Sequence, residues 1–278
     1  MQNYPEVHAS LKAIKAKLDL NFLKAKPVGL ILGTGLDALD SLLDAESLNY
    51  ADIPYFPKCS EQSHSGVLKA GYLENLPVIA LCGRVHLYEG YSPTQVCHGV
   101  RTLRGLGAET LIVTNSAGAL NPNFSIPSLM LALDQINFTG QSPLQGPNYE
   151  AWGLRFPDLS HIFDPKLINL SLKCALDLGI TLEKGVYIGV HGPELETPAE
   201  TKMYRGFGAD AIGMSSVLEV IAAKHLGFKI LQISCLSNKN LPDCMAEISL
   251  EEVIENTRLA AQDLERLLRA LAKRMTKV

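Results

Sequence analysis

Residues 28–35 read VGLILGTG, and this stretch decides the fold. Its first five residues are a short, dense apolar run, which is typical of a β-strand buried on both faces, and the run stops at Gly33-Thr34-Gly35. Similar runs follow along the chain, at residues 78–81, 110–114, 129–133, 185–190 and 229–234. Repeated strands of this kind indicate a central sheet.

Helical patterns lie between several of these strands, at residues 93–106, 166–178, 198–207 and 216–226. A further helix precedes Pro27, and the last one is indicated by an apolar stripe from Val253 to Met275, after a capping box of Ser249 and Glu252. Strands that alternate with helices predict an α/β protein. We expect a single domain over residues 1–278, with a mixed, mostly parallel central sheet flanked by helices.

The composition is that of an ordinary globular enzyme, with 278 residues, 47% hydrophobic and 19% charged, and a formal net charge of −4. Lys and Arg are scattered up to the tail at Lys273, Arg274 and Lys277, so no basic stripe is present that nucleic acid would require. No apolar run reaches the length of about 18 residues typical of a membrane span, and the start lacks a signal-peptide pattern. The six cysteines show neither CxxC pairs nor zinc-ligand spacing, which indicates reduced thiols. We expect a soluble, cytoplasmic protein that binds neither nucleic acid nor membrane and holds no metal.

The turn Gly33-Thr34-Gly35 has two interpretations. Glycines after a buried strand let backbone N–H groups approach an anion, and Thr34 adds a hydroxyl donor, so the turn suits phosphate. A tight turn with no ligand is equally consistent with these residues. Extended to Ala38, the turn also satisfies the loose GxGxxG/A pattern of dinucleotide-binding oxidoreductases.

Arg84 and His86 follow the expected strand at 78–81. Two residues apart on an extended segment, they would project from one face, and an arginine fork beside an imidazole suits an oxyanion such as phosphate. A surface salt bridge for Arg84 and an ordinary hydrogen bond for His86 remain the alternative.

Small or polar residues also stand at the ends of later strands, where α/β proteins keep their ligands. Asn115-Ser116-Ala117-Gly118 leaves room for a ligand against the backbone. Residues 213–216, with Glu219, predict a capping box whose N–H groups, together with Ser215, could bind an anion. Glu196 accepts from N–H groups, and Asn238 both donates and accepts, which suits a heterocycle with amide-like edges. Structural capping is the alternative for each of them.

Taken together and in this order, seven segments closely resemble the trimeric, inosine- and guanosine-cleaving purine nucleoside phosphorylase family. The resemblance covers nearly the whole chain, from about residue 27 to the final helix. Its segments are ILGTGL (31–36), GRVHLYEGY (83–91), VTNSAGALNP (113–122), RFPDLS (155–160), GPELETPAE (192–200), GADAIGMSSVLEV (208–220) and SNK (237–239).

The resemblance implies a role for each matching residue. Phosphate would be held by Thr34, Arg84, His86, the backbone N–H of Ser116, and Ser215. The nucleoside would contact His64, Tyr88, Phe156, Leu195, Glu196, Met214, Asn238 and Leu250. His64, Tyr88 and Met214 would meet the ribose, and Glu196 and Asn238 the base, with Asn238, His86 and Glu196 as the catalytic residues. Phe156 would come from a neighbouring subunit, which implies a homotrimer. Inorganic phosphate would be a co-substrate, and no cofactor would be needed.

The sequence departs from the family pattern at several of these positions. Leu195 stands where the family has an aromatic residue, which weakens base stacking. Leu250 replaces a histidine that contacts the ribose 5′-hydroxyl, so the 5′ pocket becomes apolar. Around His64 the usual Gly-His-Ala-Gly reads Ser63-His64-Ser65-Gly66. Together these departures suggest tolerance of 5′-deoxy or 5′-alkylthio nucleosides.

Three alternatives remain beside purine salvage by a 6-oxopurine phosphorylase. A methylthioadenosine phosphorylase shares the scaffold, but relatives that cleave 6-aminopurines generally place aspartate where Asn238 stands. A Rossmann-type oxidoreductase would need a second domain and an acidic ribose-binding residue, and the sequence indicates neither. A non-catalytic nucleoside-binding protein would need a broken phosphate site, whereas all the phosphate residues are present.

Overall fold

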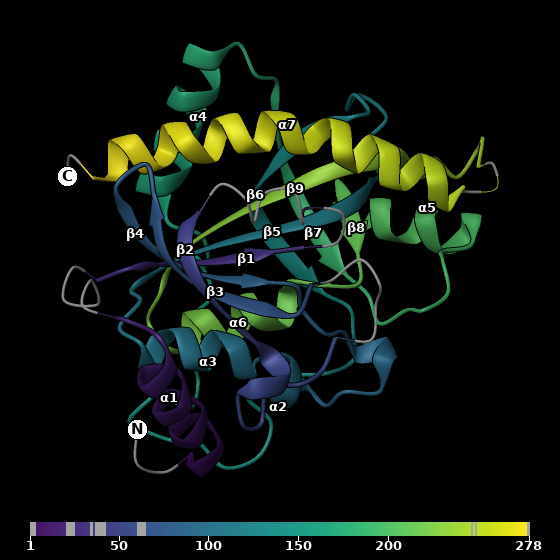
Figure 1. Ribbon diagram of the computed structural model, residues 1–278. Helices are drawn as coiled ribbons and strands as arrows, with labels where there is room; N and C mark the ends of the chain where they lie inside the picture. Colours follow the sequence, from purple (N-terminus) through teal and green to yellow (C-terminus); the bar gives the residue numbers. More distant parts are fainter. Residues whose placement is uncertain are drawn as a thin grey trace.

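Nine strands form one sheet in the part of the chain that the computed structural model describes, residues 4–20, 26–33, 36, 43–59, 65–245, 247 and 249–276, without the Leu250 side chain (Figure 1). The strands are β1 (Val28–Leu32), β2 (Asp44–Asn49), β3 (Val67–Leu73), β4 (Leu76–Cys82), β5 (Thr110–Ala119), β6 (Ser128–Asn137), β7 (Leu182–Gly189), β8 (Ala211–Gly213) and β9 (Lys229–Lys239). The helices are α1 (Pro5–Lys17), α2 (Pro93–Val96), α3 (His98–Gly105), α4 (Pro165–Leu178), α5 (Pro198–Gly206), α6 (Val217–His225) and α7 (Leu250–Met275).

The sheet runs in the order β2-β3-β4-β1-β5-β8-β7-β6-β9, and β5 also pairs with β9. The second pairing closes β5, β8, β7, β6 and β9 into a ring, while β2, β3, β4 and β1 extend from it as an open sheet. The pairs β1–β4, β1–β5, β5–β9, β6–β7 and β7–β8 are parallel, and β2–β3, β3–β4, β5–β8 and β6–β9 are antiparallel. The predicted α/β class with a mixed, mostly parallel sheet is confirmed.

Helices cover the sheet from both sides (Figure 1). Buried side chains of α1, α3 and α6, such as Ile14, Leu103 and Val220, form one apolar layer with the sheet. The stripe of α7, with Leu264 and Leu267 fully buried, forms the second layer together with α4. The dense apolar strands are therefore buried on both faces, as their sequences predict.

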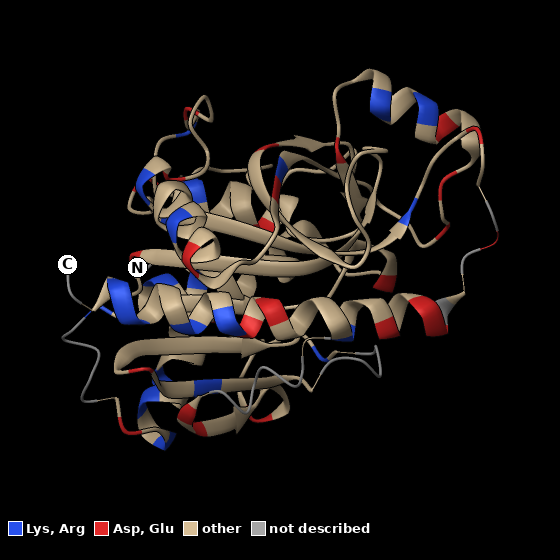
Figure 2. Ribbon diagram, turned by 90° about the horizontal axis from the view of Figure 1, so that it is seen from above, with Lys and Arg blue, Asp and Glu red and all other residues tan. Residues whose placement is uncertain are grey.

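Helix α7 carries its charges in the order that favours a helix (Figure 2). Glu251 and Glu252 lie in the first turn, and Lys273 and Arg274 in the last, so both ends complement the helix dipole. The hydroxyl of Ser249 caps the helix by accepting from the backbone N–H of Glu252 at 3.3 Å. Within the described residues, no helix is both long enough and apolar enough to pass through a membrane.

Strands β2, β3 and β8 were not expected from the sequence, and three of the expected elements differ in the structure. The helix expected at 93–106 is two helices, α2 and α3, divided at Cys97, where ψ is 4°. Strand β4 continues to Cys82, one residue beyond the expected end, and Arg84 and His86 follow it outside the sheet. Strand β5 continues to Ala119, through residues expected to form a turn. β9 pairs with β5 along this part, up to Lys239 opposite Ala119. The small side chains of β5 there leave room for the pairing.

Candidate active site

A cavity of about 210 Å³ opens where the ends of β1, β4, β5, β8 and β9 come together. Gly33, directly after β1, is part of its wall, and a Cβ atom there would lie 2.8 Å from Thr114 O and Asn115 Cα of β5. Only glycine allows the end of β1 to approach β5 so closely. The predicted site residues that line this cavity are Arg84, His86, Tyr88, Ser116, Leu195, Glu196, Met214, Ser215 and Asn238.

The other four predicted site residues are Thr34, His64, Leu250 and Phe156. Thr34 and His64 lie outside the described residues, and for Leu250 only the backbone, at the first residue of α7, is described. Phe156 lies on the irregular segment between β6 and α4, with 86% of its surface exposed. Within this one subunit, the Phe156 ring therefore has no place in the site.

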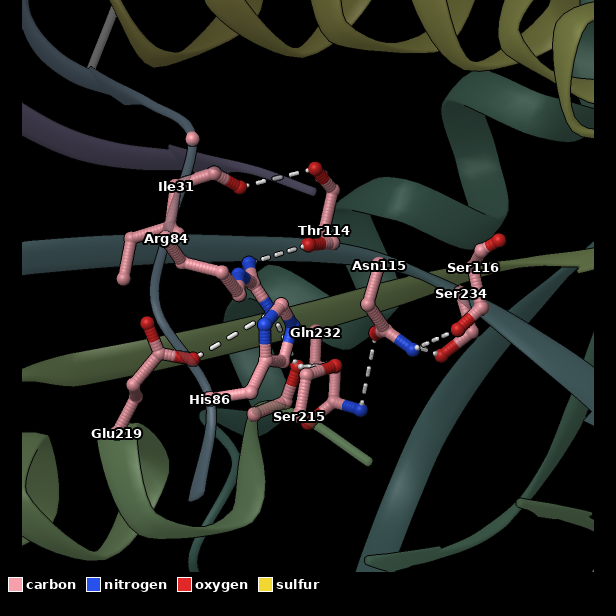
Figure 3. Close-up of polar contacts among 12 residues, drawn as sticks. Ile31, Arg84, His86, Thr114, Asn115, Ser116, Ser215, Glu219, Gln232 and Ser234 are labelled. Carbon is pink, nitrogen blue, oxygen red and sulfur yellow. Dashed lines mark hydrogen bonds and ion pairs between the residues drawn. The ribbon is translucent and has the colours of Figure 1, made fainter. Parts of the chain in front are cut away.

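Arg84 is buried and held from several sides (Figure 3). Its Nη2 donates to the Thr114 carbonyl at 2.6 Å and its Nη1 to the Ser216 hydroxyl at 3.0 Å. The Glu219 carboxylate lies 3.4 Å from Nη1, with both side chains 4% exposed. The buried Nε–H has no hydrogen-bond partner among the described residues. A fixed guanidinium with an unused N–H beside a cavity is suited to an anion.

The capping box expected at Ser216 and Glu219 is wrong. Ser216 has a φ of 65° and makes no side-chain cap bond to α6. Its hydroxyl accepts from Arg84 instead, and the Glu219 carboxylate forms the ion pair with the same guanidinium. Both side chains are thus used to hold Arg84, which the spacing of the two residues alone could not reveal.

His86 is oriented by Glu89, three residues later, in the short 3₁₀ helix Leu87–Glu89. One oxygen of the Glu89 carboxylate accepts from the His86 backbone N–H at 2.7 Å and lies 2.9 Å from Nδ1. The His86 and Tyr88 rings stack, with centroids 4.8 Å apart and an interplanar angle of 13°. The Glu89 carboxylate at Nδ1 thus fixes the orientation of the His86 ring beside the cavity.

Ser116 and Ser215 reach the cavity from β5 and from the end of β8. The hydroxyl of Ser116 lies 3.1 Å from that of Thr257, which ties β5 to α7. Ser215 lies beside Tyr187, and burial raises the pKa of the Tyr187 hydroxyl to about 12. That hydroxyl therefore stays neutral and adds no negative charge next to Ser215.

A chain of hydrogen bonds runs along the other end of the cavity, in which Ser237, Asn238, Asn240 and Glu196 take part. The Ser237 hydroxyl donates to Asn238 Oδ1 at 3.0 Å, and Asn238 Nδ2 donates to Asn240 Oδ1 at 2.6 Å. Asn240 Nδ2 in turn donates to Glu196 Oε2 at 2.9 Å. Burial raises the pKa of the Glu196 carboxyl, whereas hydrogen bonds, that from Asn240 among them, lower it. The cavity thus has a cationic end at Arg84 and an amide–carboxylate end at Asn238 and Glu196.

Known proteins share this architecture. Residues 27–273 match the phosphorylase superfamily. The chain is 45% identical over 252 residues to purine nucleoside phosphorylase 1 of Bacillus subtilis (strain 168), covering 90% of this chain and 93% of that protein. It is 40% identical over 265 residues to the purine nucleoside phosphorylase of Bos taurus, covering 92% of each. A crystal structure of Schistosoma purine nucleoside phosphorylase in complex with hypoxanthine matches with a TM-score of 0.91 at 31% identity, covering 98% of both chains.

The chain belongs to the purine nucleoside phosphorylase family. This phosphorylase is therefore an enzyme, and its reaction is phosphorolysis of purine nucleosides. The alternatives of a dinucleotide-binding oxidoreductase and of a non-catalytic binding protein are thereby excluded. Family membership does not distinguish among the purine nucleosides.

Among the residues that line the phosphorylase cavity, Asn240, Ser237, Ile212 and Val253 were missed as site residues in the sequence, and Asn115 was expected only as part of a segment that leaves room for a ligand. Asn240 stands two positions after Asn238, and on an extended strand end such a spacing puts both side chains on the same face. Asn115 is buried in β5, and its Oδ1 accepts from Ser234 at 3.0 Å and from Gln232 at 3.4 Å (Figure 3). The two-residue alternation of side chains along a strand could have identified Asn240. The partners of Asn115 lie on β9, and no local pattern indicates them.

Proposed function

We propose that this enzyme cleaves 6-oxopurine ribonucleosides and deoxyribonucleosides, with inosine and guanosine as its substrates in purine salvage. Inorganic phosphate is the co-substrate, the products are the free base and (deoxy)ribose 1-phosphate, and no metal or organic cofactor takes part. One observation supports this above the others: Glu196 and Asn238 line the same cavity as Arg84, His86 and Ser215.

Phosphate binds at the cationic end of the cavity. The unpartnered Nε–H of Arg84, the ring of His86, the hydroxyl of Ser215 and the backbone N–H of Ser116 supply its donors. The hydroxyl of Thr34 is assigned to the same site from the sequence. Charge-assisted hydrogen bonds from a buried guanidinium are among the strongest contacts that a phosphate can make.

The reaction is a displacement at C1′ of the ribose. As the glycosidic bond lengthens, the ribose becomes cationic and the purine anionic, so bound phosphate stabilises the sugar and then attacks C1′ with inversion. Tyr88 and Met214, which line the cavity, are assigned to the ribose, and His64 is assigned to it from the sequence. The Tyr88 ring stacks on the ring of His86. No covalent intermediate with the protein is needed.

The amide–carboxylate end of the cavity selects the base. The N1–H of a 6-oxopurine donates to the Glu196 carboxylate, and the Asn238 amide contacts O6 and N7, where negative charge develops on the leaving base. A 6-aminopurine has an acceptor at N1, which would face the carboxylate without a proton between them. Leaving buried polar groups unpaired costs roughly 1–3 kcal/mol, so discrimination against adenosine should be about 100-fold.

Leu195 and Leu250 favour a second class of substrate, 5′-modified nucleosides. Leu195, which is 55% exposed, lies in the cavity wall, and Val253, three residues after Leu250 on α7, does too. Leucine and valine side chains at positions 250 and 253 offer no hydrogen-bond partner for a 5′-hydroxyl, so its loss from the substrate carries little penalty. A 5′-methylthio group would occupy the same space.

The active enzyme is proposed to be a cytoplasmic homotrimer. Phe156 supports this arrangement, because a large aromatic ring that is 86% exposed in one subunit can cover the cavity of a neighbour.

Release of the free base from four nucleosides, with and without phosphate, tests these assignments. We expect phosphate-dependent cleavage of inosine and guanosine, kcat/KM for adenosine lower by about 100-fold, and 5′-methylthioinosine within roughly tenfold of inosine. Adenosine cleaved as well as inosine would overturn the role of Glu196. A strong preference for inosine over 5′-methylthioinosine would overturn the second substrate class.

A further inference from the structure

Asn240 lies between the two side chains assigned to the base. We propose that Asn240 is a positioning residue, which fixes the orientation of Asn238 and Glu196 and makes them act as one unit on a 6-oxopurine. This inference rests on the proposed function, because it assumes that Asn238 and Glu196 bind the purine.

The neighbours of Asn240 determine which way its side-chain amide points. The Nδ2 of Asn240 donates to Glu196 Oε2 at 2.9 Å, which is the contact that an ionised carboxylate, an acceptor only, requires. The Oδ1 of Asn240 then faces Asn238, and it can accept only from Nδ2, at 2.6 Å. The contact to Glu196 thereby decides which end of the Asn238 amide points toward Asn240.

Asn238 is held from its other side as well. Its Oδ1 accepts from the Ser237 hydroxyl at 3.0 Å. A flipped amide would place two oxygens against each other at Asn240, so the observed orientation is the one that satisfies both neighbours. In this orientation one N–H and one lone pair of the Asn238 amide remain for the base, and their positions are set before the substrate arrives.

Asn240 itself has little freedom. Only 3% of its surface is exposed, and its backbone N–H donates to the Ala119 carbonyl at 2.8 Å. Gly118 on β5 makes room for both amides, because a Cβ atom there would lie 3.1 Å from the Nδ2 atoms of Asn238 and Asn240. The pair of asparagines is therefore packed against β5 as well as hydrogen bonded.

The charge of Glu196 depends on the same contact. Burial raises the pKa of the Glu196 carboxyl and the nearby Glu200 carboxylate raises it further, whereas the hydrogen bond from Asn240 lowers it. Tyr204 of α5 also senses Glu196, and burial together with the carboxylates of Glu200, Glu196 and Glu194 raises its pKa, which keeps it neutral. Asn240 thus helps to keep Glu196 ionised, the form in which it accepts from N1–H.

Two substitutions separate the contacts of Asn240. Asn240→Asp keeps the shape and still accepts from Asn238, but it cannot donate to Glu196 and adds a second carboxylate there. We expect the acid limb of the pH profile of kcat/KM for inosine to move upward by about one pH unit or more. Asn240→Leu removes both hydrogen bonds, and we expect kcat for inosine to fall by about tenfold, with KM for phosphate unchanged. If Asn240→Leu does not fold, the shift of the acid limb of the pH profile in Asn240→Asp is the test of the positioning role.

The controls distinguish this inference from the proposed function. Asn123→Asp, the same change at an exposed site, should leave the pH profile of kcat/KM for inosine unchanged. Asn238→Ala should lose kcat by two orders of magnitude or more, about 2.7 kcal/mol of transition-state stabilisation. If Asn238→Ala keeps wild-type kcat, the proposed roles at the base fail. If Asn238→Ala is impaired while both Asn240 variants keep the wild-type acid limb and kcat, the inference about Asn240 is overturned.

Discussion

Arg84 and Glu219 form an ion pair that is almost completely buried. Removing one member of a buried pair leaves the other charge without compensation, which is strongly destabilising. In this enzyme a second anion is proposed to bind at the same guanidinium. Glu219 therefore balances Arg84 when the phosphate site is empty, and the two anions share one cation when it is filled.

This arrangement makes a prediction for Glu219→Gln, which keeps the shape and removes the charge. Without phosphate, the free energy of unfolding should fall by about 3 kcal/mol, because Arg84 remains buried and unbalanced. Saturating phosphate should recover more stability in the variant than it adds to the wild type, because phosphate supplies the missing countercharge. Denaturant unfolding with and without phosphate measures both quantities.

The matched control is Glu255→Gln, which removes an exposed charge that pairs with Arg258 on α7. Its response to phosphate should equal that of the wild type. An equal phosphate response in Glu219→Gln as well would show that Glu219 has no influence on the phosphate site.

At the scale of residues, the sequence predicts side chains better than it predicts their contacts. Arg84, His86, Glu196 and Asn238 could be identified because each stands in a distinctive segment next to a strand. The bonds that fix Arg84 come from residues far along the chain, so local patterns predicted a helix cap for Ser216 instead. Only the folded chain shows such contacts.

Among the elements, α1 and α3 are joined by a buried histidine. His98, the first residue of α3, lies with Nε2 2.8 Å from the Ser10 hydroxyl of α1 and packs edge-on against Phe56. Burial lowers the pKa of His98 from 6.5 to about 4, and the nearby Arg101 lowers it too. The folded protein therefore keeps His98 neutral at pH values where an unfolded chain binds a proton.

The free energy of unfolding should consequently fall as the pH is lowered from about 6.5 toward 4. Each unit of pKa difference corresponds to about 1.4 kcal/mol, so His98 should account for about 2 kcal/mol between pH 6.5 and 5. His98→Gln should lose this part of the pH dependence, as measured by denaturant unfolding at both pH values. His161→Gln, at an exposed histidine, should retain it. If the free energy of unfolding of His98→Gln depends on pH as it does in the wild type, the role assigned to His98 is wrong.

The strands that the sequence predicts are the ones with dense apolar runs, because burial on both faces leaves a clear signal. Strand β2 (Asp44–Asn49) was missed, since Leu48 is its only buried residue. Strand β8 (Ala211–Gly213) has three residues, too few for any periodicity. Strand β3 (Val67–Leu73) was missed as well, because Lys69 and Gly71 interrupt its apolar run. All three strands are defined by their neighbours in the sheet rather than by their own composition.

At the scale of the whole molecule, the role predicted for Phe156 needs a second subunit, because its ring does not line the cavity of its own subunit. Its ring is exposed, with the Arg155 guanidinium 5.6 Å from its centroid, and it lies on a segment that carries the exposed Leu154 as well. Exposed apolar side chains on one segment indicate a contact surface. The homotrimer, and the assignment of residues 1–278 to one domain, stay predictions.

Phe156→Ala tests the trimer through complementation. The variant alone should keep its stability, since the ring is exposed, and show a KM for inosine raised by about tenfold, or 1.4 kcal/mol of binding energy. Mixed trimers with Asn238→Ala should recover activity, because the inactive subunits supply Phe156 to the intact sites of their neighbours. Leu176→Ala, an exposed leucine on α4, serves as the control for loss of surface area. A monomeric mass in sedimentation, or no recovery on mixing, would refute the shared site.

The closure of β5 onto β9 has a consequence for the synthesis of the protein. The cavity needs Gly33 from the beginning of the sheet and Asn238 and Asn240 from its last strand, so a ribosome must release most of the chain before the cavity exists. A nascent chain that ends before β9 lacks Asn238 and Asn240, and with them the amide part of the proposed purine site. Purine nucleosides therefore stabilise the finished enzyme by mass action, but they cannot assist the strand pairings that form before β9 joins the sheet.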